Sequence, residues 1–329
     1  MMCRVKKRTK IKMKKIKPSA AVRMSLAAAF CLSVSVALSA PTRAERIRAK
    51  LDSADRNYVF VVMHRGDWRN APENSVDAIL GSIAKGADVV ELDVAKTKDG
   101  EYVLVHDDTI DRISNGRGRV KDLTLEEIRR YRLKGTDGKT VTGYKILTLK
   151  EAFELTRGRI LVNLDKFSRD PGGIADFVKK HGMEKELILK GSFDPESLRG
   201  KMGASYGYVA DGTLFYMPII RIDGRNAKAA FNRWQNEPKR PGAYELCFAN
   251  ENSVEVLNIL KEGQAAGAPR IWINTLWDSL CAGHTDEKGF KGDRDGSWGW
   301  CLDRGATMIQ TDRPEELIRY LEEKGRRTL

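Results

Sequence analysis

The chain has 329 residues, with 58 Lys and Arg against 45 Asp and Glu, which gives a formal net charge of +13. Ten of the basic residues fall within the first 40 positions, where no acidic residue occurs, so the rest of the chain carries only +3. A nucleic-acid-binding domain needs its basic residues on the folded surface. The nearly balanced remainder therefore argues against nucleic acid as a partner.

Residues 1–44 have the organisation of a secretory signal peptide. A basic stretch is followed by an apolar run from Met24 to Leu38 and then by small residues, in the order typical of such signals. The apolar run has about 15 residues, fewer than the roughly 20 that cross a bilayer as a helix. We expect cleavage between Ser39 and Ala44, export to a periplasmic or extracellular space, and no stable membrane anchor afterwards.

The remaining chain, about 285 residues, suits one large α/β barrel, which typically takes ~250. Apolar, β-branched runs alternate with helical stretches, a pattern that favours a parallel sheet covered by helices. Eight such runs occur, at 59–64, 88–94, 159–165, 186–190, 213–220, 243–248, 270–274 and 306–310. Eight is the number of strands in a TIM barrel. We therefore predict a single (β/α)8 barrel over residues 45–329.

Local signals mark the starts of two helices. Thr124 to Glu127 and Thr148 to Glu151 both have a threonine followed three residues later by a glutamate. This spacing is typical of a capping box, in which each residue bonds the other's backbone. We expect helices to begin after Thr124 and Thr148.

A ninth run, residues 101–106, follows the second strand after only an Asp-Gly turn. That interval is too short for a parallel crossover, so we predict a β-hairpin excursion with a primed turn. Pairing of Lys98 with Glu101 would place His106 opposite Asp93. The hairpin would then deliver a histidine to an acidic strand.

Glu91 and Asp93 are two residues apart on the second predicted strand, so their side chains share one face. Buried carboxylates need a cation. Oxygen ligands select a hard ion, Mg²⁺ or Ca²⁺, and Asp165 at the end of the third strand is our predicted third ligand. Salt bridges to neighbouring basic residues are the alternative.

Two histidines accompany these carboxylates. His64 ends the first strand, where catalytic residues of barrels lie, and His106 comes from the hairpin. Imidazoles titrate near neutral pH, so one can take a proton from an attacking oxygen while the other protonates a leaving alkoxide. Arg65, next to His64, offers a planar fork for phosphate oxygens. Together these groups predict cleavage of a phosphodiester.

Four further residues are weaker candidates. Glu73 near the start of a helix could be a metal ligand or a partner of the helix dipole. Lys166 and Lys190 lie at strand ends, where each could hold a phosphoryl group or remain solvated. Trp272 belongs with a late cluster of tryptophans that either pack or stack on the substrate.

The Gly- and Asp-rich segment at about 277–300 predicts a loop insertion after the seventh strand. Loops on this face of a barrel shape the substrate pocket. Cys281 and Cys301 flank one loop in this region, where they could form a disulfide or remain buried thiols.

The stretch from His64 to Ile128, which begins HRGDWRNAPENS and contains ELD and VHDD, closely resembles the glycerophosphodiester phosphodiesterase family. TLKEAF at Thr148 and QTDRP at Gln310 are similar to later landmarks of that family. The resemblance covers about residues 57–324.

The resemblance implies a TIM barrel that uses a divalent metal to hydrolyse glycerophosphodiesters to glycerol 3-phosphate and an alcohol. By that resemblance His64 and His106 are the acid-base pair, Arg65 binds phosphate, and Glu91 and Asp93 bind the metal. The family's chemistry implies a cyclic phosphate intermediate, formed by attack of the substrate's own glycerol hydroxyl.

The chain departs from the family pattern at two places. A strand that commonly ends in Glu-x-Lys reads NLDKF here, so Asp165 replaces the glutamate and Lys166 is one position out of phase. A strand of the WTVN type reads WINT and precedes the insertion. The substrate could therefore be a lysophospholipid or sphingolipid head group, as for phospholipase D-like relatives. A binding protein without turnover is disfavoured by the two histidines, and the sequence indicates no oligomeric state.

Overall fold

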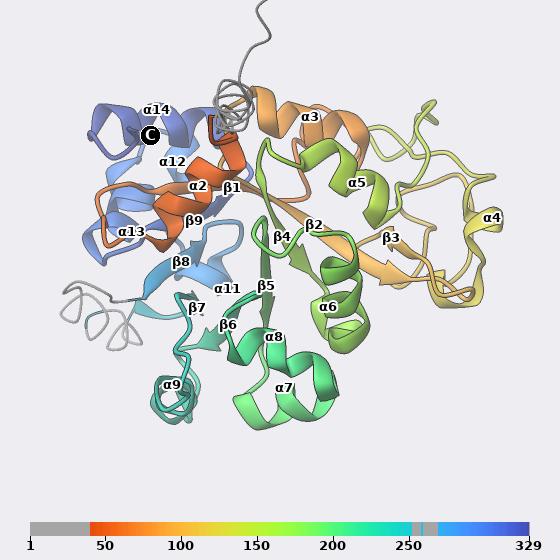
Figure 1. Ribbon diagram of the computed structural model, residues 1–329. Coiled ribbons are helices and arrows are strands. Elements are labelled where there is room, and N and C mark those ends of the chain that lie inside the picture. Colours follow the sequence, from red (N-terminus) through yellow and green to blue (C-terminus); the bar gives the residue numbers. More distant parts are fainter. Residues whose placement is uncertain (1–39, 252–257, 259–268, 329) are drawn as a thin grey trace, which may run out of the picture. The chain divides into compact units, whose positions relative to one another are not determined.

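Eight parallel strands form a closed ring in the computed structural model, which describes residues 40–251, 258 and 269–328 (Figure 1). They are β1 (Phe60–Met63), β2 (Val89–Lys96), β4 (Leu161–Asp165), β5 (Leu187–Gly191), β6 (Phe215–Arg221), β7 (Ala243–Cys247), β8 (Arg270–Asn274) and β9 (Met308–Thr311). β1 pairs with both β2 and β9, which closes the ring. The predicted TIM barrel is confirmed, and each predicted run overlaps one of these strands. The predicted signal peptide lies outside the described residues, except for its end at positions 40–44.

The ring places polar residues at one end of the barrel and apolar residues at the other. Inward-facing residues at the starts of the strands are apolar, and with helix α2 (Arg43–Asp52) they form one cluster. Side chains two residues further along a strand face the same way. On β2 the inward series is Val89, Glu91 and Asp93, and on β4 it is Leu161, Asn163 and Asp165. The carboxyl ends of the strands therefore carry the candidate chemistry.

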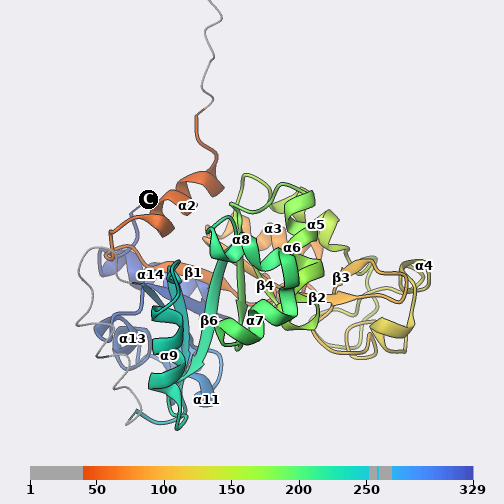
Figure 2. The same cartoon turned by 60° about the horizontal axis from the view of Figure 1, so that its bottom comes forward.

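Helix α2 closes the amino-terminal end of the barrel, and the sequence analysis did not predict it. A capping box of Thr42 and Glu45 begins the helix. Arg270, the first residue of β8, is buried and donates to the backbone carbonyls of Leu51 and Asp55 just at and beyond the helix's end. The C-terminal residues meet the same region, because Arg326 donates to the carbonyl of Asn57 (Figure 2).

The other helices connect or follow the strands and cover the outside of the barrel. They are α3 (Val76–Ala84), α5 (Leu149–Thr156), α6 (Pro171–Lys180), α7 (Pro195–Met202), α8 (Gly207–Ala210), α9 (Ala227–Gln235) and α14 (Pro314–Glu323), with α4 (Leu125–Ile128) in the lobe beyond the hairpin. Both predicted capping boxes are present, at Thr124 before α4 and Thr148 before α5. The outward-facing strand residues pack against these helices in the larger apolar core.

The predicted hairpin is present, but its predicted register is wrong. β3 (Tyr102–Leu104) pairs with β2 so that Val94 lies opposite Leu104. The backbone carbonyl of Asp93 therefore accepts a hydrogen bond from the N–H of Val105, and Asp93 does not lie opposite His106. The loop has three residues, with Gly100 at φ 87°. Gly in the left-handed region after a turn is typical of the three-residue hairpin loop. That loop shifts the pairing by one residue.

The predicted insertion folds into short helices: α11 (Asp278–Cys281), α12 (Asp286–Phe290), the π-helical turn η5 (Asp295–Gly299) and α13 (Trp300–Asp303). Trp298 and Trp300 are buried there, so they pack and do not face substrate. Cys281 and Cys301 are buried free thiols, so they do not form the disulfide considered above.

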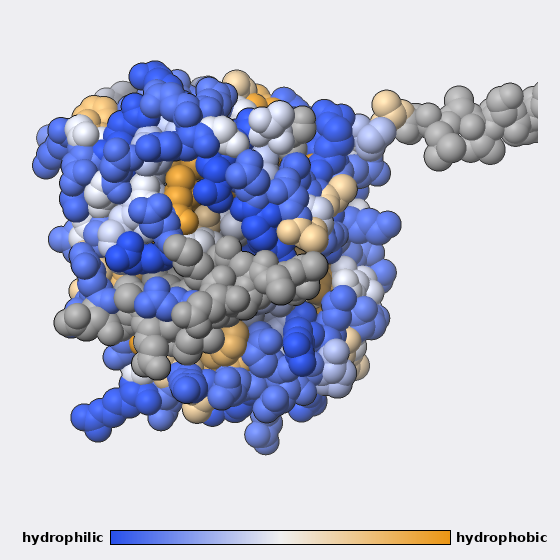
Figure 3. Space-filling model, turned by 90° about the vertical axis from the view of Figure 1, so that its left-hand side faces the viewer, coloured by the Kyte–Doolittle hydropathy of each residue, from blue (hydrophilic) through white to orange (hydrophobic). Residues whose placement is uncertain are grey.

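The surface offers few large apolar side chains. Among the described residues only Val141, Trp277 and Phe290 are large, hydrophobic and exposed. On the face shown in Figure 3, hydrophilic residues dominate and hydrophobic ones form small separate areas. Within residues 40–251 and 269–328, no helix is long and apolar enough to cross a membrane.

Candidate functional site

Three carboxylates meet on the neighbouring strands β2 and β4. The two strands pair with Glu91 opposite Asn163 and Asp93 opposite Asp165. One oxygen from each of Glu91, Asp93 and Asp165 lies within 4.8 Å of the others. The structure thus brings together the three carboxylates that the sequence predicted as ligands, which we call the acidic triad.

The acidic triad has the properties of a site for a hard cation. Burial and the charges of Asp93 and Asp165 raise the pKa of Glu91 well above its usual range. Burial also opposes ionisation of Asp165, but Lys190 and Lys166 outweigh it and lower the pKa of Asp165 to about 2. Oδ1 of Asp93 and Oδ1 of Asn163 are buried without a hydrogen-bond partner. Unpaired oxygens in an all-oxygen donor set fit Mg²⁺ or Ca²⁺.

Asn74 holds Asp93 in place, a contact that the sequence analysis missed. Its amide nitrogen donates to Oδ2 of Asp93 at 2.9 Å, and its amide oxygen accepts from the Asp93 N–H at 3.1 Å. Asn74 is buried at φ 58°, a conformation that Asn adopts more readily than most residues. Its place after Glu73 was visible in the sequence, but only the fold shows that it faces β2.

Arg65 and Glu73 form an ion pair beside the acidic triad. Nη1 of Arg65 lies 3.3 Å from Oε2 of Glu73, and Nε of Arg65 lies 3.6 Å from Oδ2 of Asp93. Arg112 binds the same Glu73 carboxylate through hydrogen bonds of 2.7 and 2.8 Å. The structure therefore corrects the prediction of Glu73 as a metal ligand, because two guanidinium groups occupy its oxygens.

His64 follows β1 and is held by Asp312, which follows β9. Nδ1 of His64 lies 3.0 Å from Oδ1 of Asp312, which also accepts from Nε1 of Trp68 at 2.6 Å. A carboxylate at one ring nitrogen fixes the orientation and tautomer of the imidazole. The other ring nitrogen of His64 is then available for proton transfer.

Asp286, in α12 of the insertion, anchors the backbone of Asp312. Its Oδ2 accepts from the Asp312 N–H at 2.7 Å, and its Oδ1 accepts from Thr275, Thr311 and Trp298. Burial raises the pKa of Asp286 to about 6, although these donors oppose the shift. The insertion thus reaches the histidine after β1 through two carboxylates that the sequence analysis did not identify.

His106 has a comparable arrangement. Its Nδ1 lies 2.8 Å from Oδ1 of Asp107, and Nε of Arg112 donates to the other oxygen of that carboxylate at 2.7 Å. The hydrogen bonds from Arg112 lower the pKa of Asp107 to about 2. Both predicted catalytic histidines therefore have a carboxylate at Nδ1.

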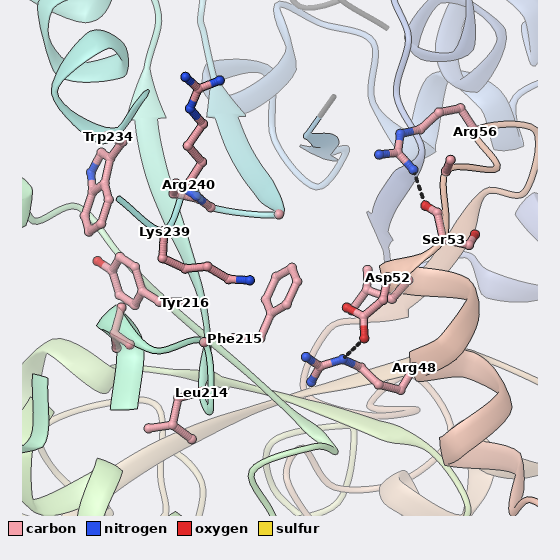
Figure 4. Close-up of a pocket in the computed structure, with 16 residues that line it drawn as sticks. Arg48, Asp52, Ser53, Arg56, Leu214, Phe215, Tyr216, Trp234, Lys239 and Arg240 are labelled. Carbon is pink, nitrogen blue, oxygen red and sulfur yellow. Dashed lines mark hydrogen bonds and ion pairs between the residues drawn. The ribbon is translucent and has the colours of Figure 1, made fainter. Parts of the chain in front are cut away.

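Both histidines line one cavity of about 670 Å³ together with Arg65 and Asp165. The cavity lies at the carboxyl ends of the strands, where TIM-barrel active sites occur. A second cavity, of about 480 Å³, lies at the opposite end of the barrel, beside Phe215 at the start of β6 (Figure 4). Arg48 and Arg56 line it from the segment containing α2. Neither histidine and no member of the acidic triad lines this second cavity.

The two predicted phosphate-binding lysines both line the first cavity. Lys166 is partly exposed, with Nζ 3.3 Å from Oδ2 of Asp165. Lys190 is buried, and its Nζ lies 3.0 Å from Oε2 of Glu245. Burial opposes the charge of Lys190, but Glu245, Asp165 and Glu91 raise its pKa. Lys190 is therefore a fixed positive charge next to the acidic triad.

The prediction that Trp272 contacts substrate is wrong. Trp272 is fully buried inside the barrel, and its ring lies beneath Lys190, with Nζ 4.9 Å from the ring centroid. It lies in the middle of β8 and belongs to the inner apolar cluster, two residues before Asn274, which does line the cavity. Trp277 lines the cavity instead; it is 51% exposed, and its ring meets His64 edge to face at 5.6 Å.

Comparison with known families agrees with this geometry. Residues 64–183 match the model of the glycerophosphoryl diester phosphodiesterase family. Over these residues the chain is therefore similar to the glycerophosphodiester phosphodiesterase family. Residues 216–321, which include the insertion, match a model described as a domain of unknown function.

A curated family member, the glycerophosphodiester phosphodiesterase of Caldanaerobacter subterraneus subsp. tengcongensis, is 42% identical over 147 residues. The matched stretch covers 43% of this chain and 60% of that protein. The chain thus matches about three fifths of this relative's length.

Two solved structures show the same fold. A glycerophosphoryl diester phosphodiesterase from Parabacteroides distasonis has a TM-score of 0.66 and 23% identity, over 85% of this chain and 92% of that one. A phosphodiesterase of Oleispira antarctica, solved in complex with the product sn-glycerol-3-phosphate, has a TM-score of 0.58 and 17% identity, over 83% of this chain and 100% of its own.

Proposed function

We propose that this protein hydrolyses glycerophosphodiesters to glycerol 3-phosphate and an alcohol. The observation that carries the proposal is the presence of His64, His106 and Asp165 of the acidic triad in one cavity. The name of the Caldanaerobacter relative and the product bound to the Oleispira enzyme support the substrate class.

Two imidazoles suit the proton transfers of this reaction. An attacking hydroxyl must lose a proton, and the leaving alkoxide must gain one. One imidazole takes the first proton and the other supplies the second, while Arg65 and Lys190 place positive charge near the phosphoryl oxygens. In the family's route the substrate's own glycerol hydroxyl attacks phosphorus and the alcohol departs; water then opens the cyclic phosphate to glycerol 3-phosphate.

We infer that Glu91, Asp93 and Asp165 hold one divalent cation, Mg²⁺ or Ca²⁺. A bound divalent cation neutralises phosphoryl charge as it develops. The Asn74 side chain orients the Asp93 carboxylate, and the Arg65 N–H orients the Glu91 carboxylate. The Oδ1 atom of Asp93 has no hydrogen-bond partner and could therefore bind the cation.

The catalytic role is tested with His64→Ala and His106→Ala. Each should lower kcat for glycerophosphodiesters by at least ~100-fold, because general acid-base catalysis contributes that much. His181→Ala is the matched control, since His181 ends α6 and binds the Phe177 carbonyl away from the cavity. Unchanged hydrolysis in either cavity variant would contradict the assignment. Preference for lysolipids over glycerophosphodiesters would favour the phospholipase D-like alternative.

The metal site is tested by first removing bound metal with a chelator. The thermal unfolding of this metal-free protein is then measured with and without added Mg²⁺ or Ca²⁺. A ligand at 100 times its Kd stabilises the folded state by about 2.7 kcal/mol. Asp93→Asn should remove most of this stabilisation, because it replaces a carboxylate of the acidic triad. Equal stabilisation of Asp93→Asn and the unaltered protein would exclude the acidic triad as the binding site.

Export is a separate part of the proposal, supported by the basic and apolar residues before Ala40. Mass spectrometry of the protein recovered outside the cytoplasm should show a new N-terminus between residues 39 and 45. Recovery of only the full-length chain within the cytoplasm would contradict it.

A further inference from the structure

The wall of the catalytic cavity farthest from His64 is formed by β6 and the segment after it. In the ring of eight, β6 stands four strands from β1 in either direction. Arg221 is the last residue of β6, and Arg225 follows before α9. Both line the same cavity as the two histidines. A substituent of a phosphodiester bound near the acidic triad can therefore project toward these arginines.

The two guanidinium groups have different surroundings. Arg221 lies 3.3 Å from Asp223, and it donates to the Ser279 carbonyl at 3.2 Å, which holds its side chain at the rim. The Arg225 side chain is exposed and makes no hydrogen bond or ion pair with any residue in the described ranges. Asp223 also accepts from the Ala249 N–H at 2.7 Å. Arg225 is therefore available to a ligand.

Among the described residues, the cavity lining contains no free carboxylate that could receive a cationic alcohol. The acidic lining residues within the described ranges are Asp165 and Glu245. Asp165 belongs to the acidic triad, and Glu245 is paired with Lys190. A choline or ethanolamine group at the β6 wall would face two guanidinium groups, and like charges brought together at an interface disfavour binding.

We propose that the cavity selects glycerophosphodiesters whose alcohol carries negative charge, such as a phosphate or carboxylate group bound by Arg221 and Arg225. This inference rests on the proposed function and names its substrate class. A guanidinium group matches two oxygens of phosphate or carboxylate with parallel hydrogen bonds. The 670 Å³ cavity is within the range that holds a small-molecule ligand of this size.

The test compares three substrates that share glycerol 3-phosphate and differ in the charge of the alcohol. They are glycerophosphocholine, glycerophosphoglycerol, and glycerophosphoglycerol with a terminal phosphate monoester. We expect kcat/KM to rise in that order and the differences to shrink at high salt, because exposed charges are screened.

Arg225→Ala should reduce kcat/KM for the phosphate-bearing substrate about fivefold relative to that for glycerophosphoglycerol, in line with the worth of an exposed charge pair. Arg221→Ala with Arg225→Ala should abolish the preference. Arg233→Ala is the matched control, because this exposed arginine of α9 does not line the cavity.

Each outcome bears on a distinct claim. Hydrolysis of all three substrates with no charge preference, or with glycerophosphocholine fastest, would overturn the selectivity and leave the proposed function intact. A preference that survives removal of both arginines would also overturn it. Failure to hydrolyse any of the three would overturn the proposed function and this inference with it.

Discussion

Replacing Asp312 measures how much the orientation of His64 contributes to turnover. The carboxylate accepts hydrogen bonds from Nδ1 of His64 at 3.0 Å and from Nε1 of Trp68 at 2.6 Å. A hydrogen bond that involves a charged group contributes about 1.5–3 kcal/mol. Since about 1.36 kcal/mol in the activation barrier changes a rate tenfold, Asp312→Ala should lower kcat roughly ten- to hundredfold. Asp312→Asn keeps an acceptor oxygen and should lose less.

The assay is steady-state hydrolysis of glycerophosphoglycerol, with kcat and KM determined separately. A loss of orientation acts on kcat more than on KM, because Asp312 does not itself line the cavity. Glu315→Gln is the control: this carboxylate near the same strand end contacts Lys85 and no histidine. A kcat for Asp312→Ala within twofold of the unaltered protein, while His64→Ala loses a hundredfold, would refute the reasoning.

Two further substitutions test the structure around the site. Arg112→Ala should destabilise the fold most at neutral pH, and the difference in unfolding free energy should shrink as pH falls from about 4 to about 2. The reason is that Arg112 lowers the pKa of Asp107 from 3.8 to about 2, so its stabilisation is present above the unfolded pKa and is lost as the folded carboxylate is protonated. Acid titration followed by urea unfolding checks this, and a difference independent of pH would contradict it. Gly66→Ala should cost about 3 kcal/mol in urea unfolding, since Gly66 has φ 74° and a Cβ there would lie 2.8 Å from the Ala78 backbone. Gly86→Ala, at φ 80° with open space, isolates the backbone cost; equal losses in both variants would show that the contact with α3 does not matter.

The register of the β2–β3 hairpin could not be predicted from the local sequence. Asp99-Gly100 correctly predicts a turn, but the hydroxyl of Thr97 accepts from the Glu101 N–H at 2.9 Å and draws Thr97 into the closing pair. That contact adds one residue to the loop and shifts every pair beyond it. The residue types permit both loops, and only the paired strands select one.

The depth of a single side chain within the barrel could also not be predicted from the sequence. Trp272 and Asn274 face the same way on β8, yet Trp272 lies below Lys190 in the apolar layer while Asn274 lines the cavity. Depth in the barrel depends on how the strands are staggered against one another. A single strand does not contain that information.

The sequence by itself determined the eight strands and the pairing of Glu91 with Asp93 on one face, because strand formation and side-chain alternation depend on residues close together in the chain. Only the tertiary structure decided that Asp312 holds His64, since 248 positions separate the two residues. It likewise decided that Arg112 pairs with the carboxylate of Glu73, although 39 positions separate the two residues in the sequence. Such contacts form only when the barrel closes and the insertion packs against it. They depend on the packing of the whole chain, and no local sequence pattern predicts them.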